Sequence, residues 1–384
     1  MRYNSTIDKC LSFIRFSMDP VSFKAPEMDD QDWASLYSFS FKQAILGVTM
    51  EGVRQLKKHD IEPPWEVLAR WLFRMVQIEK DNKAINMASA KLLQQLEKEG
   101  FRCCLLKGQG NNLLYPNAYS RTPGDIDVWM VGANGTKHPV RSIIKYVRSI
   151  KPKEKAAYHH IDFGKFDNIE TEIHYRPSFM NNFVHNHRLQ KWFLEQADVQ
   201  FENRVELPDN AGTVAVPTPE FNAVFQLVHL YTHVLNKGVG LRHIIDYYYV
   251  LLAIKDKQDM EKTLRHLGLE KIAEAMMWVM KSMLGMDEKY MIAKPNERLG
   301  RMLAKEILIR GNFGRYSSAN KKRKPGQKIP KWESKLRRNI MRLRFDLRLM
   351  LYFPSECLCE PVFRFYHYLW RRWANLCYCL TNRI

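Results

Sequence analysis

The stretch RTPGDIDVWM, residues 121–130, places two carboxylates two positions apart, at Asp125 and Asp127. A Pro-Gly pair precedes Asp125, and each acid is followed by an apolar residue, Ile126 after the first and Val128 after the second. This pattern predicts a buried β-strand entered from a turn. Side chains two residues apart on a strand share one face, so both acids should point to the same side. Two carboxylates this close repel each other unless a cation lies between them, and hard divalent cations prefer oxygen ligands. The stretch therefore predicts one edge of a metal site.

The segments around this strand predict a small α/β unit. FRCCLL has the length of a buried strand, KGQGNNLLYP is typical of a glycine turn that opens a short helix, and HPVRSIIKYVRSI is an amphipathic helix. The stretch YHHIDFGKFDNIETEIHYRP predicts a hairpin with its turn at GKFDN. We therefore expect an α+β fold, in which a small mixed sheet is flanked by helical regions.

The remainder of the chain is expected to be mostly helical. Apolar residues recur at helical spacing up to Gly100, and again from residue 181 to 284 apart from an irregular stretch near PDNAGTVAVPTPEF. NKKRKPGQKIPK is typical of an exposed linker. The predicted organisation is a helical region, the α/β core, a helical domain and a basic linker with an amphipathic tail, over residues 1–99, 100–180, 181–319 and 320–384.

Other residues of the core complete a candidate site for phosphoryl transfer. Glu172 and His174 alternate along the later strand TEIHY and should share a face, so Glu172 is the best third acid. Three such acids are suited to a pair of metal ions that clamp the attacking and leaving oxygens. The two glycines of KGQG let the backbone approach phosphate, Lys107 adds a positive charge, and Arg121 can bind a phosphate with two hydrogen bonds.

The order of these segments resembles the nucleotidyltransferase fold of the DNA polymerase β superfamily. A closer resemblance, over residues 65–250, is to the bacterial family of uncharacterised nucleotidyltransferases with a KG…R…GDID core; it includes Asn82, LLKGQGNNLLYPNAYSRTPGDIDVWM, ETEIHYRPS and HLYTHVLNKGVGLRHIIDYYYVL. The resemblance implies transfer of a nucleoside monophosphate from an NTP to an acceptor hydroxyl, with release of pyrophosphate. It implies two Mg²⁺ or Mn²⁺ ions on Asp125, Asp127 and Glu172.

The same resemblance assigns the nucleotide contacts to Lys107, Gly108, Gln109 and Arg121. The superfamily turn usually carries Gly-Ser, whereas here Gly108 is followed by Gln109 and a second glycine. This departure leaves an alternative open, in which a degenerate nucleotidyltransferase fold binds a nucleotide or a phosphosugar without turnover.

Four further residues are candidate substrate contacts: His160, His174, His229 and Arg242. For His160 the alternatives are a structural role, a general base or a base-stacking group. His229 begins HLYTH, where i,i+4 histidines fit packing better than zinc because the H-E-x-x-H pattern is absent. Arg242 either pairs with Asp246 one turn away or faces the substrate.

The basic charge is concentrated at the end of the chain. The formal net charge is +19, and the last 84 residues hold 20 lysines and arginines against 5 acidic residues. This surplus predicts an anionic partner for the tail. In KLRRNIMRLRFDLRLM one apolar stripe is bordered by arginines, which fits a helix packed on the protein, a membrane-surface helix or an RNA-binding helix; the stripe is Leu336, Ile340, Leu343, Leu347 and Met350. The acceptor is left open between RNA and a membrane-associated glycan.

The sequence shows no secretory signal, no apolar run long enough to span a membrane and no disulfide-scaffold spacing among its seven cysteines. We therefore expect a cytoplasmic protein without a transmembrane segment, with peripheral attachment to the inner membrane face as the alternative.

Overall fold

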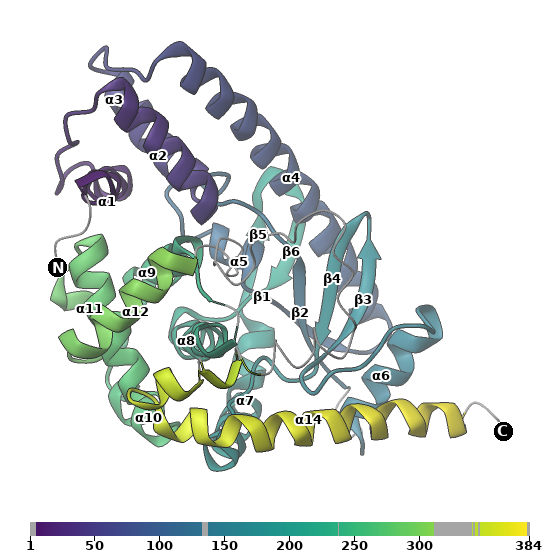
Figure 1. Ribbon diagram of the computed structural model, residues 1–384. Helices are drawn as coiled ribbons and strands as arrows, with labels where there is room; N and C mark the ends of the chain where they lie inside the picture. Colours follow the sequence, from purple (N-terminus) through teal and green to yellow (C-terminus); the bar gives the residue numbers. More distant parts are fainter. Residues whose placement is uncertain are drawn as a thin grey trace, which may run out of the picture.

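The computed structural model describes residues 5–132, 137–236, 238–310, 340, 342–344 and 346–381, with the backbone alone for 310 and 377–381. A four-stranded mixed sheet lies between two helical regions (Figure 1). Its strands are β1 (Arg102–Leu106), β2 (Ile126–Val131), β3 (His160–Phe166) and β4 (Ile169–His174). In the order β1-β2-β4-β3, only the central pair β2–β4 is parallel. The predicted α+β class with a small mixed sheet is confirmed.

Both faces of the sheet are buried, and alternate residues of β2 point to opposite faces. Ile126, Val128 and Met130 join an apolar cluster that α4 (Trp65–Lys98) and α6 (Pro139–Ile150) complete on one face. On the opposite face, Trp129 stacks on Phe221 with ring centroids 5.5 Å apart. Asp127 shares that face with Trp129, because side chains two residues apart on a strand point to the same side.

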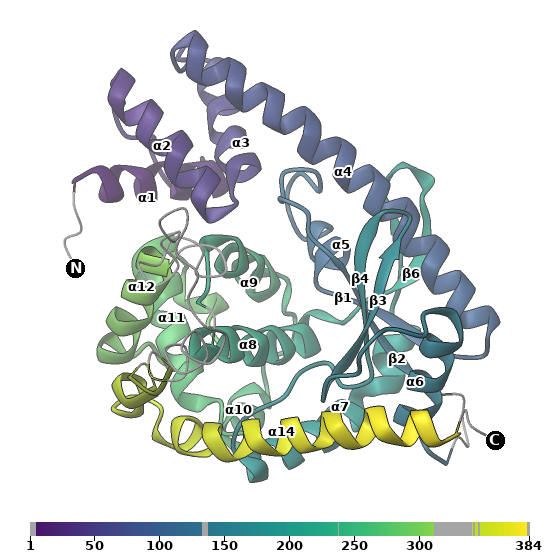
Figure 2. The ribbon, with the colours of Figure 1, turned by 45° about the vertical axis from the view of Figure 1, so that its right-hand side comes forward.

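The helical region before the sheet packs around the first half of α4. Its helices are α1 (Ser5–Met18), α2 (Asp30–Gln43), α3 (Leu46–Lys57) and α4. Fully buried aromatic residues of this cluster include Phe13 and Trp71. The second half of α4 continues across the sheet (Figure 2), so one helix joins both units. It ends before Gly100, whose φ of +84° is the left-handed conformation expected of a C-terminal glycine.

The helices that follow β1 provide the second layer and the helical domain. They are α5 (Gly108–Asn112), α6, α7 (Phe183–Glu202), α8 (Pro219–Asn236), α9 (Leu241–Ala253), α10 (Met260–His266), α11 (Glu270–Leu284), α12 (Glu297–Arg310) and α14 (Pro354–Thr381), with short 3₁₀ turns at Pro208–Asn210 and Glu288–Tyr290. Helix α8 runs behind the sheet and brings Phe221 and Phe225 against it. Helix α8 begins directly after Thr218.

One prediction for this region is wrong. Part of the segment expected to be helical or irregular is a two-stranded sheet, β5 (Arg204–Leu207) with β6 (Gly212–Ala215). Asp209 and Asn210 have φ values of +59° and +55°, as the central residues of a primed hairpin turn do. Short polar residues that tolerate this conformation explain why the turn forms without an Asn-Gly pair.

The tail runs along one edge of the molecule. In Figures 1 and 2, α14 extends from the region of α10 to that of α6. The predicted linker lies outside the described residues, as does Leu336 of the predicted apolar stripe. Ile340, Leu343 and Leu347 of that stripe are exposed, whereas Leu349 is fully buried. Among the described residues, no helix combines the length and the apolar character needed to cross a bilayer.

The packing of Trp129 against the helical layer gives a test of this fold. Trp129→Ala should lower the free energy of unfolding by about 3–5 kcal/mol, because it removes a buried indole and leaves a cavity. Trp65→Ala is the matched control, since that indole is 73% exposed at the start of α4. Urea unfolding followed by circular dichroism measures both. Similar losses for the two variants would contradict the placement of Trp129.

Candidate active site

A cavity of about 650 Å³ opens where the sheet meets the helical domain and α14. Its walls come from the turn before α5, the start of β2, the end of β4, helices α8 and α9, and the inner side of α14. Most of the predicted site residues line it, namely Lys107, Gly108, Arg121, Asp125, Asp127, His160, Glu172, His174, His229 and Arg242. The tertiary structure thus brings together residues that are up to 135 positions apart in the sequence.

The three acids lie at one end of the cavity. Asp127 and Glu172 are direct partners in the register of the parallel strands β2 and β4. Asp125 precedes β2 by one residue and is more exposed. One oxygen or nitrogen from each of Asp127, Glu172 and His174 lies within 4.8 Å of the others. Such a set of carboxylates with one imidazole fits a divalent cation, and the imidazole favours Mn²⁺ or a softer ion over Mg²⁺.

Two basic groups neutralise Asp127. Lys107 Nζ is 2.9 Å from Asp127 Oδ2, and His174 Nε2 is 2.9 Å from Asp127 Oδ1. Burial opposes ionisation of Asp127, but the charges of Lys107 and His174 outweigh it and hold the pKa of this carboxyl below its usual range. The same ring nitrogen of His174 lies 3.3 Å from Glu172 Oε2, and this contact lowers the pKa of Glu172 against the effect of burial. Repulsion from Asp127 raises the pKa of Asp125.

The backbone that presents Lys107 is strained. Its φ of +51° with ψ of −140° is a conformation that residues with a Cβ rarely adopt. Gly108 follows with φ of +41°, where glycine carries no such penalty. Helix α5 then spans only five residues. In this strained conformation the Lys107 ammonium lies in the cavity, against Asp127.

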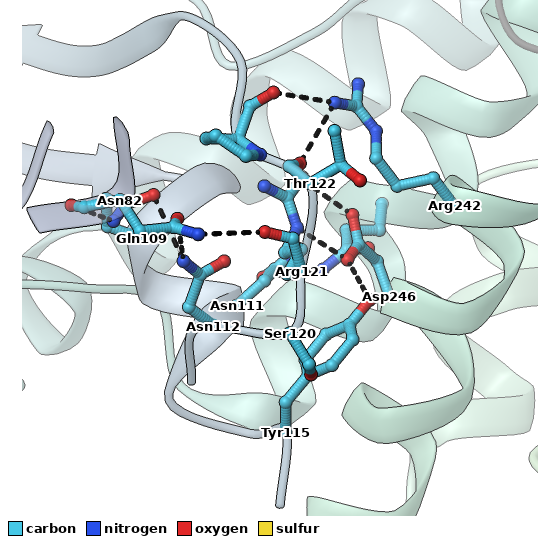
Figure 3. A network of polar contacts seen from close by, with 12 residues as sticks. Asn82, Gln109, Asn111, Asn112, Tyr115, Ser120, Arg121, Thr122, Arg242 and Asp246 are labelled. Carbon is cyan, nitrogen blue, oxygen red and sulfur yellow. Dashed lines mark hydrogen bonds and ion pairs between the residues drawn. The ribbon is translucent and has the colours of Figure 1, made fainter. Parts of the chain in front are cut away.

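Gln109 is not in the cavity, although the resemblance assigned it to the nucleotide. Its side chain is buried, and Nε2 donates to the carbonyl of Asn82 at 3.2 Å and to Asn86 Oδ1. Asn82 in turn accepts from Asn112 at 2.8 Å and donates to the carbonyl of Arg121 at 3.0 Å (Figure 3). Gln109 and Asn112 therefore fix the turn to α4, and Asn82 holds the backbone before the acids.

Arg121 is anchored by a carboxylate of the helical domain. Its guanidinium donates to Asp246 of α9 through Nε at 2.7 Å and Nη2 at 2.9 Å (Figure 3). The Tyr115 hydroxyl donates to the same carboxylate at 2.6 Å. All three side chains are buried. Burial opposes the charge on Asp246, but Arg121 outweighs it and lowers the pKa of this carboxyl. The fork that the sequence suggested for a phosphate thus binds Asp246, and the third nitrogen, Nη1, has no hydrogen-bond partner among the described residues.

Arg242 lies beside Arg121 at the cavity wall. Its Nη1 is 3.3 Å from the carbonyls of Thr122 and Pro123 (Figure 3). Burial, and then repulsion from Arg121, lowers the pKa of Arg242 to about 10, so the group is charged at neutral pH. Two guanidiniums against the single carboxylate of Asp246 leave this wall positively charged.

Several histidines line the cavity. His160 Nδ1 is 3.9 Å from Glu172 Oε2, and His229 Nε2 is 3.0 Å from Nε2 of the histidine one turn later. Burial, and then the charge of Lys107, holds the pKa of His229 well below its usual value, so the ring is neutral. His243 and His367 also line the cavity. No sequence pattern singled out these two histidines, because their helices reach the site only through tertiary packing.

The buried ion pair gives a second test. Arg121→Met should lower the free energy of unfolding by about 3–5 kcal/mol, because Asp246 is left buried without its counter-charge. Arg265→Met is the matched control: its partner Glu261 is 72% exposed, and such pairs contribute at most about 1 kcal/mol. Chemical unfolding measures both. A small effect of Arg121→Met would contradict the burial of Asp246.

The charge of His174 predicts a pH dependence of stability. Burial opposes protonation, but Asp127 and Glu172 outweigh it and raise the pKa of His174 from 6.5 to about 9. A raised folded-state pKa adds stability that is complete below pH 6.5 and is lost as the pH rises through about 9. The difference in unfolding free energy between wild type and His174→Gln, measured in EDTA, should therefore shrink across this window. A constant difference would show that His174 is neutral.

Comparisons with known proteins identify the family of the chain. No curated protein matches the chain. Among solved structures, an antigenic nucleotidyltransferase-like protein from Paracoccidioides brasiliensis is similar at 15% identity and a TM-score of 0.34, over 57% of this chain and 97% of that one. The sequence profile described as "Uncharacterised nucleotidyltransferase" matches residues 29–285, from α2 to the end of α11. The chain belongs to the family of uncharacterised nucleotidyltransferases.

Proposed function

We propose that the protein transfers a nucleoside monophosphate from an NTP to an acceptor hydroxyl and releases pyrophosphate. The observation that carries the proposal is the register of Asp127 with Glu172 on adjacent strands, with Asp125 at the entry of the first strand. This places three carboxylates at one end of a cavity whose volume of about 650 Å³ is within the range of ligand sites. Membership of the nucleotidyltransferase family supports the same class of reaction.

The acids are the residues that would hold divalent cations. Asp127 would contribute to both ions, with Asp125, Glu172 and the imidazole of His174 as the other ligands. Bound cations would supply the positive charge that stabilises the attacking oxygen and the leaving pyrophosphate. Because His174 must lose its proton to act as a ligand, its contacts with Asp127 and Glu172 would compete with the cation.

The basic residues would orient the triphosphate. Lys107 lies against Asp127, so phosphate oxygens placed over the acids would be within its reach. Arg242 adds a charge at the wall beside Gly124. Nη1 of Arg121 remains available, whereas its other donors are held by Asp246. These fixed charges would stabilise the negative charge that develops on the departing pyrophosphate.

The reaction itself exchanges two phosphorus–oxygen bonds. The acceptor oxygen forms a bond to the α-phosphorus as the bond from that phosphorus to the bridging oxygen breaks, and pyrophosphate carries away the electron pair. Glu172 would accept the acceptor's proton, because its lowered pKa keeps it ionised at neutral pH and it is only half-buried. The proposal leaves the acceptor open between an RNA hydroxyl and a membrane-associated glycan.

One observation favours a second candidate function. Both oxygens of Asp127 already contact a basic group, Lys107 on one side and His174 on the other. A site whose central acid is neutralised by the protein itself can bind a nucleotide or a phosphosugar without metal or turnover. This alternative predicts ligand binding that EDTA does not weaken.

Transfer of label from α-³²P NTPs in the presence of Mn²⁺ or Mg²⁺ tests the proposal. We use total RNA and a lipid extract as separate acceptor pools, and release of pyrophosphate as the second readout. Asp127→Asn should reduce both signals at least about 100-fold, because it removes the charge at the centre of the acid cluster. Glu170→Gln is the matched control, since that carboxylate lies on β4, the strand paired with β2, but is exposed and pairs with Lys165.

The outcomes separate the two functions. Label transfer that persists in Asp127→Asn would contradict the assignment of the acids. Nucleotide binding by wild type that survives EDTA, without label transfer or pyrophosphate release, would establish the binding function instead.

A further inference from the structure

Helix α14 carries an uncovered apolar stripe along its outer side. The spacing of these residues, four, three, four, four and three positions apart, places them on one helical face. Each is between 48% and 62% exposed, and they are Leu358, Val362, Phe365, Leu369, Trp373 and Leu376. A single exposed leucine is ordinary, but a stripe over five turns of one helix is not.

The short helical stretch just before α14 also exposes apolar residues. Ile340, Leu343, Leu347 and Leu351 follow one another at helical spacing, and their exposed fractions range from 44% to 75%. We call these four residues and the six of α14 the tail face. The sequence predicted an amphipathic helix here; the structure exposes Ile340, Leu343 and Leu347 of its apolar stripe, whereas Met350 packs partly buried against the core.

Charges in the same segment are sorted by sign. Its three acidic residues, Asp346, Glu356 and Glu360, are at most 4% exposed. By contrast, five arginines are exposed: Arg344, Arg348, Arg364, Arg371 and Arg372. Of these, Arg364 and Arg371 also line the cavity, so the exposed surface of residues 340–376 presents apolar and cationic groups, while its acids are buried.

The inward acids hold the helix in place, so the exposed stripe does not result from a loosely attached tail. Glu356 Oε2 accepts from the backbone nitrogens of Asn181 at 2.6 Å and Asn182 at 3.1 Å. Glu360 pairs with Arg342 at 2.5 Å. Phe363, on the inner side, is only 1% exposed and stacks near Phe179 with centroids 5.7 Å apart. The orientation of α14 is fixed by these contacts.

We propose that the tail face binds the surface of an anionic lipid bilayer. Helices that lie in the membrane interface combine an apolar stripe with flanking arginines and an aromatic residue such as Trp373. Phosphate headgroups complement the arginines, and the acyl region accepts the leucines. Attachment at the surface agrees with the finding that no described helix can cross a bilayer.

Other occupants fit the tail face less well. A second copy of the chain would bring the same arginines together across a two-fold axis, and like charges repel. RNA would be attracted by the arginines, but it offers nothing that requires ten exposed apolar side chains. The proposal does not depend on the reaction at the cavity. It does place that cavity beside the bilayer, because Arg364, His367 and Tyr368 of α14 line it.

Flotation of the full-length protein with vesicles tests the proposal. Vesicles of phosphatidylglycerol with phosphatidylcholine should carry the protein, and pure phosphatidylcholine should carry much less. Phe365→Gln with Leu369→Gln should weaken binding more than about tenfold, because two apolar side chains that the bilayer would bury are lost. Arg344→Glu with Arg372→Glu should weaken it more than about 25-fold, at roughly fivefold for each charge.

Matched double variants on α4 control for the loss of apolar surface and of charge. Phe73→Gln with Val76→Gln removes two side chains that are 71% and 70% exposed, and Arg70→Glu with Lys98→Glu changes the net charge equally. Both should leave flotation unchanged. All variants replace exposed residues, and chemical unfolding confirms that they fold.

Three results would overturn the proposal. One is equal flotation of wild type and the Phe365/Leu369 variant, which would show that charge attraction alone binds the vesicles, without the apolar residues of the tail face. Another is that light scattering shows the wild type as a dimer and this variant as a monomer, while neither binds vesicles. The last is binding to polyuridine that the arginine variant loses, again without vesicle binding.

Discussion

The ion pair between Arg121 and Asp246 connects the two halves of the site. It joins the loop before β2 to helix α9, while Asn82 of α4 holds the carbonyl of the same arginine. The removal of either charge would leave the other buried without compensation, which is far more costly than the net gain from the pair. The direction in which β2 presents Asp127 therefore depends on three elements at once, and a rigid contact of this kind is what a metal or nucleotide site requires.

A balance of charge governs the cavity. Three carboxylates lie at the start of β2 and at the facing position of β4. The protein offsets their charge with Lys107 and a protonated His174. Without such offsets their mutual repulsion would raise the carboxyl pKa values, as it does for Asp125. Lys107 and His174 must give up their contacts with the carboxylates when a cation or a triphosphate binds. The same charged groups would therefore pair differently in the empty site and in the occupied site.

The tail follows a related rule of charge placement. Its acids are buried, where Glu356 and Glu360 anchor α14, whereas five of its described arginines and the leucines of the tail face are exposed. The helix is thus a wall of the cavity on one side and an uncovered amphipathic surface on the other. The concentration of basic residues at the end of the chain has a structural counterpart, because the described acids of that segment contribute nothing to its surface.

The sequence alone determined the local chemistry of the core. Alternation in GDIDVWM and TEIHY predicted which residues share a face, because a strand has a period of two wherever it is placed. The succession of strands and helices along the chain and the hairpin turn also followed from short-range patterns. Only the tertiary structure decided the partners. It paired the guanidinium of Arg121 with Asp246, 125 residues away, buried Gln109 against α4, and left part of the predicted tail stripe exposed. Such pairings depend on how helices pack across the chain, and helical periodicity defines an apolar face without stating what, if anything, covers it.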